Sequence, residues 1–405
     1  MAAPPRDGCC VIAPARHRRL DSLEFVRAAC ALVVLFDHVY GERVRITHWA
    51  PLVALASYGE DAVIGFFVLS GCEISMQQYR DKRRYLQARL VRLMPIYFTL
   101  LIASALAMLA CGVPVGFWHF AATALFADSL YSEAAFPLRF FIPSWSLAYE
   151  LYYYIAFVAI MAWPRLVLPL FGLSVAAGLA TYFITPHSEI ENAAEHAFSF
   201  FCMWLCGVLV TRLVGRNHTV SIATGAWALT VGLCLSRVPF SEPSKFDFIR
   251  LLGFSLGFAL FIWSLLSDRK GDTVRRFDLG LGGRVGVAAL VLPYVWELST
   301  AHLPMKAAAS AVLVVFTLAP QAMCAAIARL ARPVLPFMVY VGGLSYALYL
   351  VHYPLVQTFN ILSPLPGIVN VAIITALSFA LAHFLDYRFQ PWVRARLIGP
   401  DAARP

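Results

Sequence analysis

The stretch Leu23–Tyr40 is an apolar run of about the length that crosses a bilayer, yet it carries Arg27 and His38. The step of eleven residues from Arg27 to His38 turns a straight α-helix about 20° beyond three full turns and advances it about 16 Å. Both side chains therefore lie along one helix face. A charged group inside a membrane costs about 2.5–3.5 kcal/mol and normally faces a partner or a wet cavity. The stretch predicts a polar passage with Arg27 and His38 at its two ends.

The composition is that of an integral membrane protein. Of the 405 residues, 60% are hydrophobic and only 14% are charged, whereas soluble domains have roughly 25% charged residues. No polar block is long enough to form a separate soluble domain. Arg16, Arg18 and Arg19 precede the first apolar run and no small-residue cleavage site follows it, so we expect a retained first helix rather than a signal peptide.

Apolar runs divide the chain into twelve candidate membrane spans. They cover residues 23–40, 62–79, 94–112, 145–163, 166–185, 195–214, 220–236, 249–267, 285–299, 306–328, 339–360 and 369–388. With a cytoplasmic N-terminus, most lysines and arginines fall on the cytoplasmic side, as the positive-inside rule requires. We therefore predict an all-α, polytopic transmembrane helix bundle of about 10–12 helices. Residues 1–20 and 393–405 are the predicted cytoplasmic tails, residues 21–392 are the transmembrane domain, and the short apolar piece Phe117–Ala127 is an expected interfacial or re-entrant helix.

His38, Glu150 and His352 fall in the outer half of the membrane on this topology. A neighbouring carboxylate holds a histidine in one tautomer and raises its basicity. We therefore predict that His38 and Glu150 are catalytic, with His38 as general base and Glu150 orienting or charging it, and that His352 supports them. The alternative is structural, either an ion pair or a neutral histidine bonded to a backbone carbonyl.

Three arginines fall near the inner surface instead. Arg27 lies about one turn inside it, and Arg89 and Arg92 immediately precede the third predicted span. Guanidinium groups that converge on a cavity mouth suit phosphates, which they bind in a bidentate manner, so we predict that these arginines bind the phosphate groups of a ligand. Glu73 lies at a depth similar to that of Arg27 and is its expected ion-pair partner. The basic run Arg80–Arg92 also permits a second interpretation, as a topology signal that contacts anionic lipid headgroups.

Five ordered pieces of the chain form a recognisable set. They are Arg27 followed by His38, FFVLSG at Phe66–Gly71, the basic segment from Arg84 that ends in Arg92-Leu-Met-Pro95-Ile-Tyr97, Trp145-Ser146-Leu147 followed by Glu150, and LSYALYLVHYPL at Leu344–Leu355. As a set, from Leu20 to about Trp392, they resemble the acyltransferase-3 family of integral membrane acyltransferases. The resemblance implies supporting positions for four residues within these pieces, Ser70, Trp145, Ser146 and Tyr349.

Two features depart from the family pattern. The family often has an Asp two residues before its Phe-Phe pair, where this chain has Ile64, and Glu60 and Asp61 lie a turn earlier. The family core commonly has ten helices, and the additional apolar material here lies between Asp268 and Pro336. Some relatives append an extracytoplasmic hydrolase-like domain, which we do not expect in this chain.

The resemblance implies an O-acyltransferase that moves an acyl group, most often acetyl, from cytoplasmic acyl-CoA to a hydroxyl of a glycan or glycolipid-like acceptor. Acetyl-CoA is then a donor substrate, with Arg27, Arg89 and Arg92 as its donor-binding residues, and not a bound cofactor. No metal is expected, because the nine cysteines lack metal-ligand spacing and the chain has no HExxH motif. The expected partners are acyl-CoA, the glycan acceptor and the bilayer, with no nucleic acid, and the expected location is a bacterial inner membrane.

Two mechanisms of transfer and two other functions stay open at the level of sequence. The acyl group passes either directly to the acceptor or through a covalent acyl-histidine. A proton-coupled transporter or an exporter of lipid-linked sugars would use the same Arg, His and Glu residues as a proton relay, although the sequence shows no inverted repeat. The remaining alternative is a non-catalytic membrane scaffold.

Overall fold

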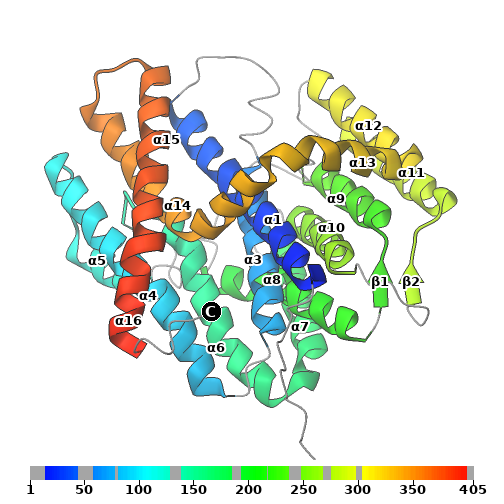
Figure 1. Cartoon of the computed structure of the whole chain (residues 1–405), viewed down its shortest axis with the longest axis horizontal. Helices are drawn as coiled ribbons and strands as arrows, with labels where there is room; N and C mark the ends of the chain where they lie inside the picture. Colours follow the sequence, from blue (N-terminus) through cyan, green and yellow to red (C-terminus); the bar gives the residue numbers. More distant parts are fainter. Residues whose placement is uncertain are drawn as a thin grey trace, which may run out of the picture.

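The computed structural model of the chain is a bundle of α-helices with a single pair of three-residue strands in the part that it describes (Figure 1). It describes residues 14–43, 58–77, 81–127, 138–184, 193–216, 218–236, 248–267, 275–297 and 303–398. Residues 1–13 and 399–405 of the two predicted tails lie outside these ranges. The prediction of an all-α, polytopic bundle is confirmed.

The helices follow one another in chain order as follows. The first half contains α1 (Pro14–Arg43), α3 (Gly59–Met76), α4 (Lys82–Ala110), α5 (Phe117–Ala124), α6 (Trp145–Ala162), α7 (Val167–Ile184) and α8 (Ala193–Gly215). The second half contains α9 (Ile222–Leu235), α10 (Phe248–Leu266), α11 (Leu281–Glu297), α12 (Leu303–Leu318), α13 (Pro320–Ala331), α14 (Leu335–Leu362), α15 (Gly367–Phe384) and α16 (Gln390–Ile398). Short 3₁₀ turns lead into α6, α7 and α14, and the π-helical segment Leu385–Phe389 joins α15 to α16.

Six helical segments are long and apolar enough to cross a membrane, counting only the described residues. They are Lys82–Ala110, Ile142–Ala162, Ala197–Gly215, Phe248–Leu266, Pro320–Leu362 and Gly367–Leu397. Four shorter apolar helices accompany them. The helices α1 and α3 are equally continuous, but their ionised residues, which include Arg27 and Glu73, make them more polar than an ordinary span. The chain is an integral membrane protein by this architecture.

Each predicted span overlaps a helix of the structure, but the segment 306–328 is two helices rather than one. The break falls between α12 and α13 at Ala319 and Pro320. Proline has no backbone N–H, and its ring clashes with the carbonyl group four residues earlier in a helix. A helix therefore rarely continues through proline without a break or a kink. The short predicted helix near Phe117 is present as α5, and its Phe117 and Trp118 are 71% and 79% exposed.

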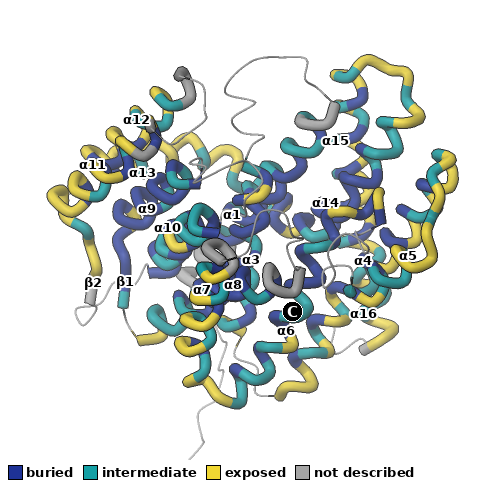
Figure 2. Tube along the Cα trace, turned by 180° about the vertical axis from the view of Figure 1, so that it is seen from behind, coloured by how far each residue is buried: buried dark blue, intermediate teal, exposed yellow. Residues whose placement is uncertain are grey.

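The centre of the molecule is formed by α1, α3, α8 and α14 (Figures 1 and 2). The helix α1 packs along α14, and α3 packs along α8. Small residues allow the second contact to be very close, since a Cβ at Gly71 would lie 2.1 Å from the carbonyl oxygen of Trp204, and one at Gly207 would lie 2.0 Å from that of Val68. Glycine at such positions lets two helix backbones touch.

Outer helices flank this centre on both sides. The helices α9, α11, α12 and α13 gather at one side with the parallel strand pair β1 (His218–Val220) and β2 (Arg275–Phe277), and α4, α5, α15 and α16 lie at the other (Figure 1). Exposed segments concentrate on these outer helices, whereas buried residues dominate the centre (Figure 2). Leu106, Leu290 and Ile368 are 61%, 76% and 70% exposed, as suits side chains that face lipid.

Proline in α4 shapes the wall that carries two of the predicted donor-binding arginines. Pro95 cannot donate to the carbonyl oxygen of Val91, four residues earlier. The amide of Gln390 on α16 donates to that oxygen instead, over 2.6 Å.

The helix α4 begins at Lys82, and the side chain of the preceding Asp81 caps it by accepting from the Arg83 N–H over 2.9 Å. Arg89 and Arg92 therefore lie inside one helix, three residues apart.

Candidate active site

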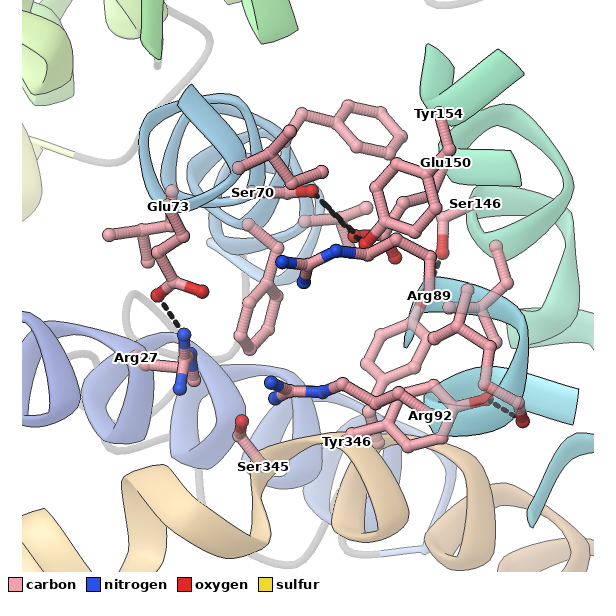
Figure 3. A pocket seen from close by; sticks show the side chains of 18 residues that line it. Arg27, Ser70, Glu73, Arg89, Arg92, Ser146, Glu150, Tyr154, Ser345 and Tyr346 are labelled. Atoms are coloured by element: carbon pink, nitrogen blue, oxygen red, sulfur yellow. Dashed lines mark hydrogen bonds and ion pairs between the residues drawn. The ribbon is translucent and has the colours of Figure 1, made fainter. Parts of the chain in front are cut away.

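One cavity opens between α1, α3, α4, α6 and α14 (Figure 3). It contains about 740 Å³ of empty space, counting the part that opens to solvent. The polar residues that line it are Arg27, Ser70, Glu73, Arg89, Arg92, Ser146, Glu150, Tyr154, Ser345, Tyr346 and Tyr349. Apolar side chains of α3, α4 and α6 complete the wall, among them Phe66, Phe67 and Leu93.

Arg27 forms one end of the cavity and is held by two carboxylates. Its guanidinium donates to Glu24, one turn earlier on α1, over 2.7 Å and 2.9 Å, and to Glu73 on α3. The Arg27 residue is only 9% exposed. The buried charge is therefore compensated by one carboxylate on its own helix and one on α3, as a cation in an apolar bundle requires.

Arg89 and Arg92 reach the same cavity from α4. Both side chains extend into it toward the side on which Arg27 lies (Figure 3). Arg89 is buried, donates to the Gln77 side-chain oxygen and lies 5.9 Å from the centre of the Tyr154 ring. Arg92 is exposed and makes no hydrogen bond or ion pair with any described residue. Of the three cations, Arg92 is thus the one whose donors are available to an incoming anion.

Glu150 sits on the opposite wall in a network of hydroxyl groups. Its Oε1 accepts from the Ser70 hydroxyl over 2.6 Å and from the Tyr154 hydroxyl. The Ser70 oxygen in turn accepts from the Trp204 indole N–H over 3.3 Å. This network connects α6 to α3 and α8. Its Glu150 carboxylate and Ser70 hydroxyl line the same cavity as the arginines.

Tyr349 closes the end of the cavity that leads toward His352. Its hydroxyl donates to the carbonyl oxygen of Pro143 over 3.0 Å and lies 2.8 Å from the Ser146 hydroxyl. One helical turn further along α14, the His352 ring lies edge-on to Tyr349 with ring centroids 6.2 Å apart. Tyr349 therefore links the arginine-lined cavity to a second polar group.

That second group is a histidine pair. The Nδ1 atom of His38 on α1 lies 2.9 Å from the Nε2 atom of His352 on α14. The Nδ1 atom of His352 lies 2.9 Å from the backbone carbonyl oxygen of Leu348. His352 is fully buried, whereas His38 is half-buried, and the Tyr353 ring contacts His38 edge-on at 5.1 Å. The accessible member of the pair is therefore His38.

The residues that form these groups all lie within the range matched by one family model in the comparison with known proteins. The model of the acyltransferase-3 family, described as an acyltransferase domain, matches residues 20–386. The chain belongs to the acyltransferase-3 family. It is therefore a membrane acyltransferase. No curated protein and no solved structure gives a match.

The acyltransferase-3 motifs come together as one site in the structure, with His38 and His352 adjoining it. Eight of the predicted site residues line the cavity, namely Arg27, Ser70, Glu73, Arg89, Arg92, Ser146, Glu150 and Tyr349. Trp145 lies behind this wall, in edge contact with Phe67 and Tyr149 at 6.4 Å and 5.5 Å between ring centroids. Arg27 and Glu73 form the expected ion pair.

The expected contact between Glu150 and His38 is not what the structure has. Within the described residues, His38 bonds to His352, and Glu150 bonds to Ser70 and Tyr154. The reason is the position of Glu150, which faces the turn of α3 that carries Ser70, one turn from Glu73 and the ion pair with Arg27. Glu150 therefore lies with the arginines rather than beside His38.

Some residues of the acyltransferase-3 cavity escaped the sequence analysis. Tyr154 belongs to the aromatic run Trp145–Phe157, which resembles ordinary packing, yet its hydroxyl reaches Glu150 and its ring lies beside Arg89. The spacing of four residues from Glu150 was the available signal, because such pairs face each other on a helix. Ser345 and Tyr346 lie within the LSYALY piece and also line the cavity. Trp204 had no signal in the sequence.

Proposed function

We propose that the protein is an O-acyltransferase that transfers a short acyl group, such as acetyl, from acyl-CoA to a hydroxyl of a glycan or glycolipid acceptor. The observation that supports this most is the pairing of an arginine-lined cavity with a half-buried histidine farther along the same helix. Phosphate groups and a reactive thioester are the two ends of acyl-CoA, and the two sites suit these two ends.

The donor phosphates would bind at Arg92, with Arg89 and Arg27 behind it. Arg92 has no ionic partner among the described side chains, so it can bind phosphate without breaking an existing contact. Arg27 already contacts Glu24 and Glu73, and a phosphate would compete with them. We therefore assign the largest direct contribution to Arg92 and a smaller one to Arg27, which would exchange a carboxylate contact for a phosphate.

The distance between the two sites suits the shape of the donor. On a continuous α1, His38 is eleven residues beyond Arg27, which corresponds to about 16 Å along the helix axis. The pantetheine arm of CoA separates its phosphates from its thioester by a long flexible chain. An acyl-CoA with its phosphates at the arginines could thus present the thioester near His38, past the apolar wall and Tyr349.

The chemical step uses His38 as a base beside the thioester. His38 takes the proton of the acceptor hydroxyl as its oxygen attacks the thioester carbonyl carbon. The carbon–sulfur bond breaks, CoA leaves as a thiolate that is then protonated, and the new oxygen–carbon bond is the ester. Glu150 would act in the cavity by holding Ser70 and Tyr154, which it accepts hydrogen bonds from.

The membrane arrangement completes the proposal. A cytoplasmic N-terminus would put the arginines toward the cytoplasm, where acyl-CoA is made, and His38 toward the outside, where a surface glycan is displayed. The bacterial inner membrane is the compartment that fits this arrangement. The transfer would then carry an acyl group across the bilayer without moving either substrate through it.

A vesicle experiment tests the proposal. Sealed vesicles of known protein orientation would enclose surface polysaccharide that mild alkali has freed of esters, and labelled acetyl-CoA would be added to the outside. We expect ester label on the enclosed polysaccharide only when the N-terminal side of the protein faces the added donor. His38→Ala should reduce this transfer by about 10²–10⁴-fold. Transfer that needs donor and polysaccharide on the same side, or none at all with the wild-type protein, would refute the proposal.

A further inference from the structure

The two histidine rings face each other edge to edge. Their centroids are 5.0 Å apart and their planes differ by 22°, while the two facing nitrogens are 2.9 Å apart. The nitrogens are thus much closer than the ring centres, so the rings lie nearly in one plane with a nitrogen of each pointing at the other. This is the geometry of an N–H···N hydrogen bond rather than of face-to-face stacking.

The Leu348 carbonyl oxygen, at the end of the hydrogen-bonded series that starts at His38, determines which ring nitrogens carry a hydrogen. The Leu348 carbonyl oxygen can only accept, so the Nδ1 atom of His352 must carry a hydrogen and donate to it over 2.9 Å. A neutral His352 then has a lone pair on Nε2. The contact with His38 is a hydrogen bond only if the Nδ1 atom of His38 carries a hydrogen and donates it to that lone pair.

The burial of His352 supports the neutral form. Its side chain is 0% exposed, and no carboxylate contacts it within the described ranges. A second proton on His352 would place an uncompensated charge in an apolar interior, which is costly. The same burial means that His352 cannot touch a substrate in the cavity, whereas half-buried His38 can.

We propose that His352 is a positioning residue that holds His38 in the Nδ1–H tautomer, so that the Nε2 atom of His38 is the base. This inference rests on the proposed function of His38 and assigns to His352 the role that the sequence analysis gave to Glu150. The acceptor's proton goes to Nε2 of His38, and its Nδ1–H stays bonded to His352. That bond becomes charge-assisted and stronger as positive charge develops on His38. His352 neither gains nor loses a proton in the step.

Two substitutions separate this role from simple packing. His352→Leu fills the space but offers no acceptor to His38, whereas the side-chain oxygen of His352→Gln can accept its Nδ1–H. We expect His352→Leu to lower kcat by at least about tenfold, and by less than His38→Ala, with the KM for acetyl-CoA unchanged. We expect His352→Gln to recover most of the lost kcat. His383→Leu, a change of the same kind at an exposed histidine of α15, should leave kcat unaltered.

A spectroscopic measurement tests the tautomer without any assay of activity. Solid-state NMR of histidine-labelled protein in bilayers distinguishes a ring protonated at Nδ1 from one protonated at Nε2, and the His38→Ala spectrum identifies the His38 signals. We expect the Nδ1–H form for wild-type His38 and a mixture of forms in His352→Leu. A wild-type His38 protonated at Nε2 would overturn the inference even if a variant fails to fold.

The outcomes also separate this inference from the proposed function. If His38→Ala is inactive but His352→Leu keeps the wild-type kcat, the inference fails and the proposed function stands. If His352→Gln is as impaired as His352→Leu while its His38 keeps the Nδ1–H form, tautomer control is not the cause and the inference fails. If the wild-type protein uses no acetyl-CoA, the proposed function fails and the inference fails with it.

Discussion

Arg27 on α1 and Glu73 on α3 form an ion pair in the wall of the cavity, although 46 positions separate them in the chain. Both lie within apolar stretches of helices that carry other ionised residues as well. Glu24 holds the Arg27 guanidinium from the other side over 2.7 Å. The arrangement neutralises a buried cation without removing it from the cavity. It also makes the stability of the bundle depend on residues that line the site.

Glu73→Gln tests the structural share of this pair. Removing one partner of a buried pair costs about 3–5 kcal/mol, whereas replacing both partners with apolar residues is often neutral. Because Arg27 keeps its contact with Glu24, we expect Glu73→Gln to lower the thermal unfolding temperature in detergent by only part of this amount. We expect the triple substitution Glu24→Gln, Arg27→Met and Glu73→Met, which removes all three charges, to restore it. The triple variant should still bind acetyl-CoA less tightly. Equal thermal stability of wild type and Glu73→Gln would contradict a structural role of the pair.

Arg92→Ala tests the donor site. A hydrogen bond to a charged group contributes about 1.5–3 kcal/mol, which is about tenfold or more in affinity. We expect the KM for acetyl-CoA to rise by roughly that factor while kcat changes little, because phosphate binding is common to the ground and transition states.

Added salt should reproduce part of this defect, since Arg92 is exposed and screening weakens exposed contacts. Arg84→Ala provides the matched control, because Arg84 belongs to the same helix with a side chain that is 86% exposed and outside the cavity. A KM that rises equally in both variants would point to general surface charge rather than to a donor site.

Glu150→Gln distinguishes a role in the cavity from a role at His38. The carboxamide oxygen can still accept from Ser70 and Tyr154, so the network that Glu150 organises should largely persist. We expect a smaller loss of kcat than in His38→Ala and a larger loss in Glu150→Ala, measured at saturating acetyl-CoA. If Glu150→Gln lowers kcat as much as His38→Ala does, Glu150 takes part directly in proton transfer.

The helices and the arginine site could be predicted from the sequence because they depend on local properties. Apolar length predicts a membrane helix, and ionised residues in such a helix predict a polar interior. Arg89 and Arg92 share a helix, so their common orientation follows from their spacing alone.

The partner of His38 could not be predicted in the same way. It comes from α14, 314 positions later, and depends on which faces of α1 and α14 meet. Depth in the membrane suggested that Glu150 and His352 were both near His38, but depth does not specify the rotation of a helix about its axis. Trp204 was missed for the same reason, because the close contact of α8 with α3 brings its indole to Ser70.

Gly71→Ala tests whether that close contact positions the site. The added Cβ would lie 2.1 Å from the Trp204 carbonyl oxygen, which is backbone and cannot turn aside. The two helices must therefore separate, and the bond from the Trp204 indole to Ser70 should lengthen with them. We expect a lower unfolding temperature and reduced activity.

Gly172→Ala, in α7, is the matched control, since no atom of the described residues, apart from its chain neighbours and its own helix backbone, lies within 4 Å of the added Cβ. Alanine favours a helix over glycine by about 1 kcal/mol, so this variant should be as stable as the wild type or more stable. Gly207→Ala should behave like Gly71→Ala, because its Cβ would meet the Val68 carbonyl oxygen from the other side of the same contact, 2.0 Å away. Wild-type stability and activity in both Gly71→Ala and Gly207→Ala would show that the α3–α8 spacing does not position the Ser70 and Glu150 network.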